Sequence, residues 1–570
     1  MVSRRDRQPV LLILAMLMLA SSPVSTVDAS TYVVMIPMDS PIYVELETLD
    51  GLGYLDTYFS EIRPFSRVEA ARLTLEAERN MRMEDKFEPL AVRLTRTLDL
   101  QLSEEIGWLR NNTEDNLPNL IHPLQSVEAQ YVYSEGSRRH WMFGPNGPIN
   151  AQEGTPLLPN NDGLQTDPGS NEIVRASGWA GFGSFITTYA EGAAAGPLTH
   201  NIPGTSRGQL LGAEAAASLG NDVISFGQEE RWWGTGQFGA LSQGDNAKPF
   251  YALTFQNIHP RYLPWFLRYL GPGRRQIFLG QLDASRAFAQ HPWIAGHVLV
   301  FKPLPYFEFG ITREIIFGGR NNDHYNFGGF LGRFTGIATG NPANGQTKSQ
   351  GGIFLKFHIP KLRGLQIYQE MNGADNLTKE VPQIGHYMPF LAVSYQGGIY
   401  LPRLTEDGLT DFRIEYTLNC GGYDVEDGSS LYFTYDNQLL NQPIGPNATQ
   451  VNVQFGRWLD GIRYKANVDM FYTEEAPSVY EGGFDFPYPA RSAFYPFATL
   501  TKEHSGGVAF DMQSLAQVAS LGRSRALIDG NGRVAVEYVD RLNYGAPGSV
   551  RALMSLSVAI TPLWKSLEWR

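Results

Sequence analysis

The sequence predicts a mainly β protein: a large antiparallel β-barrel that spans a membrane and is preceded by a small helical bundle. Three observations support this fold class. Charged residues make up 18% of the chain, below the roughly 25% of soluble domains, whereas aromatic residues reach 12%. Long segments beyond residue 126 alternate apolar and polar side chains, as strands do. The chain also begins with a segment typical of exported proteins.

Residues 1–29 have the layout of a secretory signal peptide, with a basic start, an apolar run and a small-residue exit. We expect cleavage after Ala29. An uncleaved anchor is disfavoured because the apolar run is too short to span a bilayer comfortably. The single cysteine, Cys420, excludes an internal disulfide framework. The net charge of −12 argues against a nucleic-acid partner.

The region that follows the signal peptide has helical spacing and predicts about three helices. In DSPIYVELETLDG, Asp39 or Ser40 is expected as the N-cap and Gly51 as the stop. Ser66 and Glu69 have the spacing of a capping box. The last helix is expected to bury apolar residues three and four positions apart, namely Phe87, Leu90, Leu94, Leu98, Leu102 and Ile106.

The chain is therefore expected to divide into a signal peptide at 1–29, a periplasmic helical bundle at 30–120 and a barrel at 121–570. Both ends of an even-stranded barrel lie on the periplasmic side. Within the bundle, GLGYL and RPFSRVEAARL resemble a surface-layer homology repeat, a module that binds cell-wall polymers. That resemblance implies a tether between membrane and cell wall. A structural helical cap is the alternative interpretation.

The segment DFRIEYTLN, residues 411–419, alternates without interruption. We expect Ile414 and Tyr416 to face lipid and Arg413 and Glu415 to face the lumen. IRYKANVDM, residues 462–470, has the same pattern. Inward charged residues of this kind can form a network that stiffens and plugs a barrel. The inward residues expected from the two segments are Asp411, Arg413, Glu415, Arg463, Lys465 and Asp469.

Further alternating runs are SVEAQYVYS, RVAVEY and MSLSVAIT, and segments such as DGNG at 529–532 are expected to be turns. Runs of about nine residues can cross a bilayer as tilted strands. A secreted β-sandwich is the competing interpretation, but its strands average about five or six residues. The chain beyond the bundle is long enough for about sixteen to twenty barrel strands.

The segment RWWGTGQFGALSQGDNAKPF, residues 231–250, suits neither an amphipathic helix nor a soluble strand. If it lies on a barrel strand, Trp232 and Trp233 face opposite sides, one in an aromatic girdle and the other inward. The glycines at 234, 236 and 239 are expected to permit a sharp bend or a close approach of backbones.

This segment, together with WFLRYLGPGRRQIFLGQLD, GHVLVFKPLPYFEFGITREIIFGG and DGLTDFRIEYT, resembles the capsule assembly proteins of the Wzi family in Gram-negative outer membranes. The resemblance covers most of the chain after the signal peptide. It implies an outer-membrane barrel of about 18 strands with a periplasmic helical bundle. It also implies a lectin-like protein that retains capsular polysaccharide at the cell surface and is not an enzyme.

The chain offers little catalytic chemistry. Glu229 and Glu230 invite comparison with a glycosidase, but neighbours on a strand point to opposite faces and cannot flank one glycosidic bond. The histidines lack metal-ligand spacing, and no glycine-rich segment has the context of a nucleotide site, so we expect no metal and no cofactor. Aromatic faces, amides and arginines can instead bind sugars. The residues predicted to bind polysaccharide are Arg231, Trp232, Trp233, Gln237 and Asn246.

Three functions are compatible with this sequence. The first is a lectin-like barrel that anchors capsular or extracellular polysaccharide, with outer-membrane lipid as its surroundings and a monomer as its expected state. The second is a porin or channel for small solutes, because charged lumen residues suit either role. The third is the tether between outer membrane and cell wall.

Overall fold

The computed structural model describes the greater part of the chain in fifteen stretches. They are residues 31–143, 149–196, 207–284, 290–322, 327–335, 347–374, 378–381, 386–389, 393–419, 432–446, 448–475, 502–521, 524–544, 548–563 and 566–568. The predicted signal peptide at 1–29 and Cys420 lie outside these residues.

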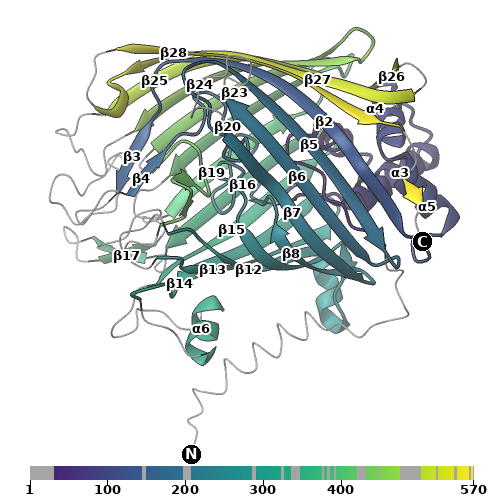
Figure 1. The fold of residues 1–570 in the computed structure, drawn as a ribbon, viewed down its shortest axis with the longest axis horizontal. Coiled ribbons are helices and arrows are strands. Elements are labelled where there is room, and N and C mark those ends of the chain that lie inside the picture. Colours follow the sequence, from purple (N-terminus) through teal and green to yellow (C-terminus); the bar gives the residue numbers. More distant parts are fainter. Residues whose placement is uncertain are drawn as a thin grey trace, which may run out of the picture.

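The described residues form a closed barrel of 18 antiparallel strands (Figure 1). The sheet closes on itself because the last long strand pairs with the first, so that Ile560 lies opposite Val127. The predicted fold class is therefore confirmed, and the sandwich interpretation is wrong. The long strands are β2 (Leu120–Glu135), β5 (Gly169–Phe182), β6 (Ile186–Gly196), β7 (Arg207–Leu219), β8 (Asp222–Gln228), β10 (Tyr251–Asn257), β12 (Pro272–Gln281), β13 (Trp293–Leu304), β14 (Phe307–Phe317), β15 (Lys348–Ile359), β16 (Leu365–Ala374), β19 (Val393–Leu401), β20 (Thr410–Asn419), β23 (Ala448–Leu459), β24 (Tyr464–Glu475), β25 (Glu503–Ser514), β27 (Ser524–Asp540) and β28 (Ser549–Pro562).

Short elements complete the barrel and its surroundings. The short strands β11 (Arg261–Tyr262), β26 (Gln517–Leu521) and β29 (Leu567–Glu568) extend the main sheet. Four two-stranded sheets pair β1 (Ile62–Arg63) with β9 (Trp232–Trp233), β3 (His140–Phe143) with β4 (Ile149–Gln152), β17 (Thr378–Val381) with β18 (His386–Pro389), and β21 (Thr434–Tyr435) with β22 (Gln438–Leu439). The short helices are η2 (Trp265–Leu270), α6 (Phe327–Phe334) and η4 (Leu542–Tyr544).

The two ends of the barrel differ. At one end, here named the turn end, short connections such as residues 183–185 and 305–306 join consecutive strands. At the opposite end, the loop end, connections are longer, as in residues 136–168 between β2 and β5. Figure 1 shows the helices α3, α4 and α5 gathered at the turn end and strands β3, β4 and β17 at the loop end.

Along the wall strands, polar side chains that face the lumen alternate with apolar side chains that face outward, as expected of a membrane barrel. In β20, Arg413 and Glu415 are 3% and 0% exposed, whereas Tyr416 is 46% exposed. The predicted faces of this strand are confirmed, with Ile414 on the outer face beside the exposed Ile399. Exposed apolar residues recur on strand after strand around the outside, among them Phe226, Leu253, Ile311, Ile353, Ile399, Phe455, Val468, Val508, Val534 and Val558.

Two local predictions are wrong. The DGNG segment at 529–532 lies inside the long strand β27, because the strand continues to Ser524 and pairs along its length with β28. Arg463 precedes β24 and lies in a turn, where it pairs with Asp460 at 3.4 Å and is largely exposed. The other expected inward residues, Asp411, Arg413, Glu415, Lys465 and Asp469, are buried in the lumen.

The N-terminal helices begin where their caps predict. The helix α2 (Pro41–Gly51) has Ser40 as N-cap, and in α3 (Arg67–Met83) the Ser66 side chain accepts from the backbone N–H of Glu69. The expected third helix is instead two, α4 (Pro89–Gln101) and α5 (Ser103–Asn111), and Phe87 is 54% exposed rather than buried. No helix in the described residues is long and apolar enough to cross a membrane.

The N-terminal region also enters the lumen. Residues 31–34 and Ile36 are buried, and α2 contacts inward-facing side chains of the wall. Glu47 pairs with Arg413 on β20 at 2.7 Å, and Asp50 pairs with Lys356 on β15 at 3.3 Å. The helices share one apolar core with the turn end of the barrel, including Trp458, Ile462 and Leu515. The division into a bundle at 30–120 and a barrel at 121–570 stays a prediction.

Candidate functional site

The segment 229–250 lies inside the lumen rather than in the wall. Strand β9 leaves the main sheet and pairs with β1, so that Trp232 lies opposite Arg63 and Trp233 opposite Ile62. The expectation that one tryptophan joins a girdle is therefore wrong, since Trp232 and Trp233 are 3% and 0% exposed. The alternation rule failed because it applies to a wall strand with two different surroundings, and this short strand has lumen on both sides.

Trp233 anchors the segment in an apolar core within the barrel. Its ring lies 5.1 Å from that of Phe278 on β12, and its Nε1 donates to Gln276 Oε1 at 2.6 Å. Inward-facing apolar residues of neighbouring strands complete this core, including Ile294, Val298, Val300, Ile316 and Phe354. A buried indole with a satisfied N–H contributes both apolar contact and orientation.

Three carboxylates from separate strands bind the segment from the wall. Glu370 on β16 accepts from the backbone N–H of Thr235 and of Leu241, at 3.1 and 2.8 Å. Glu415 on β20 accepts from the backbone N–H of Gln237 at 2.9 Å. Glu314 on β14 accepts from Gln243 Nε2 at 2.6 Å. These buried carboxylates thus accept hydrogen bonds from backbone N–H groups and a side-chain amide of the segment that would otherwise be buried without a partner.

The glycines of this segment allow the close approach that the sequence predicts. A Cβ on Gly236 would clash with the side-chain amide of Gln396 and the carbonyl oxygen of Gly239. A Cβ on Gly239 would clash with the amide of Gln442. The backbone therefore lies directly against inward side chains.

Of the predicted polysaccharide-binding residues, Arg231 and Asn246 are buried and partnered. The Arg231 guanidinium lies over the rings of Phe250 and Phe278 at 4.7 and 4.8 Å and donates to Thr254 Oγ1 at 3.2 Å. Asn246 Nδ2 donates to the Leu439 carbonyl oxygen at 3.2 Å. With the two tryptophans these residues support the segment, whereas Gln237 lines a cavity.

This cavity, here named the amide cavity, has a volume of about 360 Å³. It lies between the wall of β23 to β27 and three segments inside the lumen, which are the N-terminal region, the β2–β5 connection and the segment 229–250. The wall side carries both neutral amides and charged side chains. Gln237 and Phe238 of the inward segment, Asn160 of the β2–β5 connection and Tyr43 of α2 lie on the other side. The amides of the wall side are Gln450, Asn452, Gln454, Asn467, Gln513 and Asn531.

Three of these amides, Gln450, Asn452 and Gln454, form a row along β23, and each donates a hydrogen bond to an inward side chain. Asn452 Nδ2 donates to Gln450 Oε1 at 2.9 Å, and Gln450 Nε2 donates to Thr473 Oγ1 at 2.8 Å. Gln454 Nε2 donates to Asp469 Oδ1 at 2.7 Å. Each of these bonds uses one N–H of a group that carries two, so the row retains the capacity to bind hydroxyl groups. Sequence reasoning missed this row, although Gln450, Asn452 and Gln454 alternate visibly with Val451, Val453 and Phe455.

The charged residues of the amide cavity are largely paired with one another. Arg551 binds Glu153 at 2.6 Å, and Arg139 binds Glu537 at 2.9 Å. Arg533 binds Asp511 at 2.8 Å. The pairing leaves a surface on which amides and a few aromatic faces are available, which is the chemistry of hydroxyl recognition.

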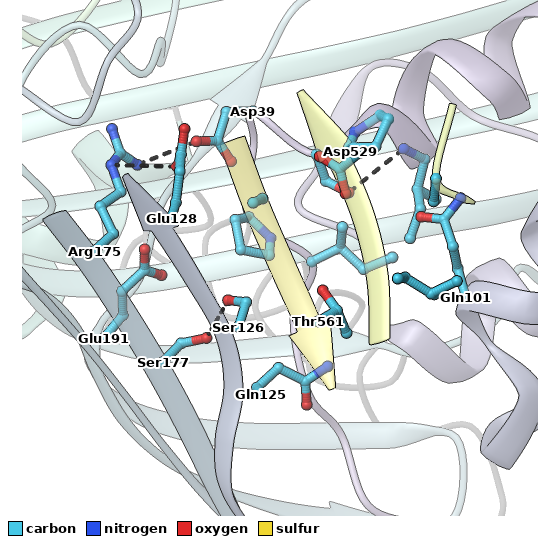
Figure 2. A pocket seen from close by; sticks show the side chains of 18 of the residues that line it. Asp39, Gln101, Gln125, Ser126, Glu128, Arg175, Ser177, Glu191, Asp529 and Thr561 are labelled. Carbon is cyan, nitrogen blue, oxygen red and sulfur yellow. Dashed lines mark hydrogen bonds and ion pairs between the residues drawn. The ribbon is translucent and has the colours of Figure 1, made fainter. Parts of the chain in front are cut away.

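A second cavity, here named the acidic cavity, adjoins the first and shares Asp39, Ser40, Gln513 and Asn531 with it. Its volume is about 140 Å³. Figure 2 shows Arg175 reaching from its strand toward Asp39 and Glu128, with Glu191 beside it and Asp529 across the cavity. The distances from Arg175 are 3.2 Å to Asp39 and 3.9 Å to Glu128.

Arg175 also binds Asp162 of the β2–β5 connection at 2.7 Å. The carboxylate oxygens of Asp162, Glu230 and Asp245 lie within 4.8 Å of one another. No spacing in the sequence indicates this grouping, because Asp162 comes from the β2–β5 connection and the other two residues come from the segment 229–250. The arrangement places three acidic side chains close together, with Arg175 bound to one of them.

Comparison with known proteins gives the family. The family model described as capsule assembly protein Wzi matches residues 144–478, more than half of the chain. An uncharacterized 55.8 kDa protein from the cps region of Klebsiella pneumoniae is 29% identical over 214 residues. This match spans 37% of the chain and 41% of that relative, so it covers about two fifths of the relative's length.

Two solved structures match this chain over most of its length. Wzi of Escherichia coli, described as an outer membrane protein involved in group 1 capsule assembly and a carbohydrate-binding β-barrel, matches with a TM-score of 0.59 at 15% identity. The match covers 92% of this chain and 98% of that one. OprD of Pseudomonas aeruginosa matches with a TM-score of 0.42 at 8% identity, over 78% of this chain and 96% of that one. From the extent of the family match, we conclude that this chain belongs to the capsule assembly protein Wzi family.

Proposed function

We propose that this protein is an outer-membrane, lectin-like barrel that retains capsular or extracellular polysaccharide at the cell surface. Family membership supports the biological role, and the belt of exposed apolar residues supports a lipid environment. The observation that carries the binding role is the amide cavity, whose row of side-chain amides faces Gln237 and Phe238 across a space of about 360 Å³. Ligand pockets are commonly about 300–1,000 Å³.

The five residues predicted from the sequence remain part of this proposal in two roles. Gln237 contacts the sugar, because it lines the amide cavity. Arg231, Trp232, Trp233 and Asn246 support the segment that presents Gln237, since all four are buried. Each hydroxyl contact is weak, but a polysaccharide presents many repeats, so that a layer of barrels retains it by multivalency.

We further propose that the protein is not an enzyme. Glu229 accepts a hydrogen bond from the side-chain amide of Gln256 at 3.1 Å and lies near Arg231. Glu230 accepts a hydrogen bond from the backbone N–H of Met38 at 2.8 Å. The two carboxylates thus bind different parts of the protein. A glycosidase needs both to face one bond across a fixed gap.

The test compares surface-bound with released polysaccharide in a capsule-producing Gram-negative host, with and without the gene. Loss of the protein is expected to move polysaccharide into the medium. The double substitution Asn452→Ala and Gln454→Ala should reproduce part of this release, whereas Gln281→Ala, an exposed amide outside the cavity lining, should not. Unchanged retention without the gene would contradict the proposed function.

A further inference from the structure

One cation of the amide cavity differs from the others. Arg139, Arg533 and Arg551 each bind a carboxylate within 3 Å. Arg63 also lines the cavity and is 9% exposed, yet it makes no ion pair with any residue that the structure describes. Glu47, whose carboxylate also interacts electrostatically with Arg63, is already bound by Arg413 at 2.7 Å.

The Arg63 guanidinium is held in a fixed position. Its Nε donates to the Ser60 carbonyl oxygen at 3.1 Å, and this is its one hydrogen bond to a described residue. Its central carbon lies 5.4 Å from the ring centroid of Tyr43 and 5.8 Å from that of Trp232. The two nearby rings and the bonded Nε restrict the side chain, so it has little conformational entropy left to lose on binding a ligand. Its two terminal nitrogens make no hydrogen bond to a described residue and remain available to a ligand.

The inward segment explains this position. Trp232 lies opposite Arg63 in the pairing of β1 with β9, and that pairing is secured by Trp233 and the carboxylates of the wall. The buried tryptophans therefore do not contact the cavity themselves. They place one arginine at its edge.

We propose that the amide cavity binds an acidic sugar unit of the polysaccharide, whose carboxylate is bound by the terminal nitrogens of Arg63 while the amides bind its hydroxyls. This inference rests on the proposed function and names the class of saccharide. An arginine edge matches the two oxygens of a carboxylate. Each of the five acids that line the cavity already has an arginine within 4 Å, which reduces its repulsion of a bound carboxylate. Asp39 pairs with Arg175, Glu153 with Arg551, Glu537 with Arg139, and both Asp511 and Asp469 with Arg533.

The experiment titrates the purified full-length barrel in detergent with tetragalacturonate, with its neutral methyl ester and with maltotetraose. The wild-type protein should bind tetragalacturonate at least tenfold more tightly than the other two, because a charge-assisted hydrogen bond is worth about that factor or more. Raised salt should reduce this preference. Equal binding of the acid and its ester, or no binding of the acid, would overturn the proposal.

Variants separate the arginine from the rest of the site. Arg63→Gln should lose the preference for the acid and keep the affinity for maltotetraose, and Arg63→Lys should recover only part of it because lysine lacks the planar edge. Arg457→Gln, on the outer face and paired with Asp407, is the matched control and should bind as the wild type does. If Arg63→Gln fails to fold, the comparison of tetragalacturonate with its methyl ester on the wild-type protein still tests whether the site prefers an acidic sugar.

The outcomes for this inference and for the proposed function are distinct. If Arg63→Gln keeps the wild-type preference for the acid, the assignment of Arg63 is wrong, while polysaccharide retention by the wild-type gene still supports the proposed function. If cells with and without the gene retain polysaccharide equally, the proposed function fails whatever the titration shows.

Discussion

At the scale of single residues, the face of the wall on which a side chain lies decides its surroundings. Arg413 points inward, where it binds Glu47 at 2.7 Å and lies 4.2 Å from the ring of Tyr400. Ile414, the next residue, lies on the outer face with Ile399 opposite. One step along the strand thus changes the surroundings from a buried ion pair to an apolar belt.

Lysine at Ile414 should therefore destabilise the assembled barrel by about 2–4 kcal/mol if the site is near the bilayer midplane, because a charge is placed in lipid. The matched substitution Arg413→Lys keeps an inward charge beside Glu47 and should cost less. Refolding into vesicles, followed by heat-modifiable migration, measures both. Equal tolerance of the two substitutions would contradict the assigned faces.

At the scale of elements, helices and strands with a periodic pattern of apolar residues can be predicted from the sequence. The contacts of segments that leave the barrel wall cannot. The N-caps of α2 and α3 and the faces of β20 follow from local spacing, and the structure confirms them. The segment 229–250 carries composition but no period, so its residues were recognisable as unusual while their contacts were not. Those contacts come from strands far away in the sequence, such as Glu370 and Glu415.

Gly236→Ala should destabilise this inward segment by about 1–3 kcal/mol, because the new Cβ overlaps the amide of Gln396 and forces the backbone away from Glu415. Thermal unfolding in detergent measures the change. Gly208→Ala is the control, since a Cβ there meets nothing within 4 Å. Equal unfolding temperatures for the two variants would show that the segment is not packed as described.

The docking of α3 should depend on pH through Glu69. Burial alone would raise the pKa of Glu69, but Arg72 and His259 outweigh it and lower the pKa to about 2. A lowered folded-state pKa means that the stabilisation is present above the unfolded value, about 4.5, and is lost as pH falls toward 2. At neutral pH it amounts to about 3 kcal/mol.

Unfolding measured at pH 7, 4 and 2.5 checks this dependence. The wild-type protein should exceed the Glu69→Gln variant in stability at pH 7, and the difference should shrink as the pH falls. A difference that stays constant across this range would assign Glu69 a role without linked protonation.

At the scale of the whole molecule, the direction of the barrel follows from its two unlike ends. Short turns face the periplasm in barrels of this kind, and here the turn end carries α3, α4 and α5 (Figure 1). We therefore expect a tag placed after Ala29 to be inaccessible on intact cells and accessible after permeabilisation. A tag introduced in the β2–β5 connection at the loop end is the positive control, and labelling of the first tag on intact cells would reverse the assigned direction.

The lumen of this barrel is occupied rather than open along the residues that the structure describes. The helix α2 binds inward side chains of β15 and β20, and the segment 229–250 binds those of β14, β16 and β20. In the lining of the acidic cavity, Arg175 joins Asp39 to Asp162. In a planar bilayer the wild-type protein should therefore conduct little.

Replacing residues 234–241 by a short Gly-Ser linker removes the part of the segment that Glu370 and Glu415 bind. This replacement should raise the conductance, because ions can then pass beside α2. A wild-type conductance as high as that of the linker variant would contradict an occupied lumen and favour the solute-channel function over polysaccharide retention.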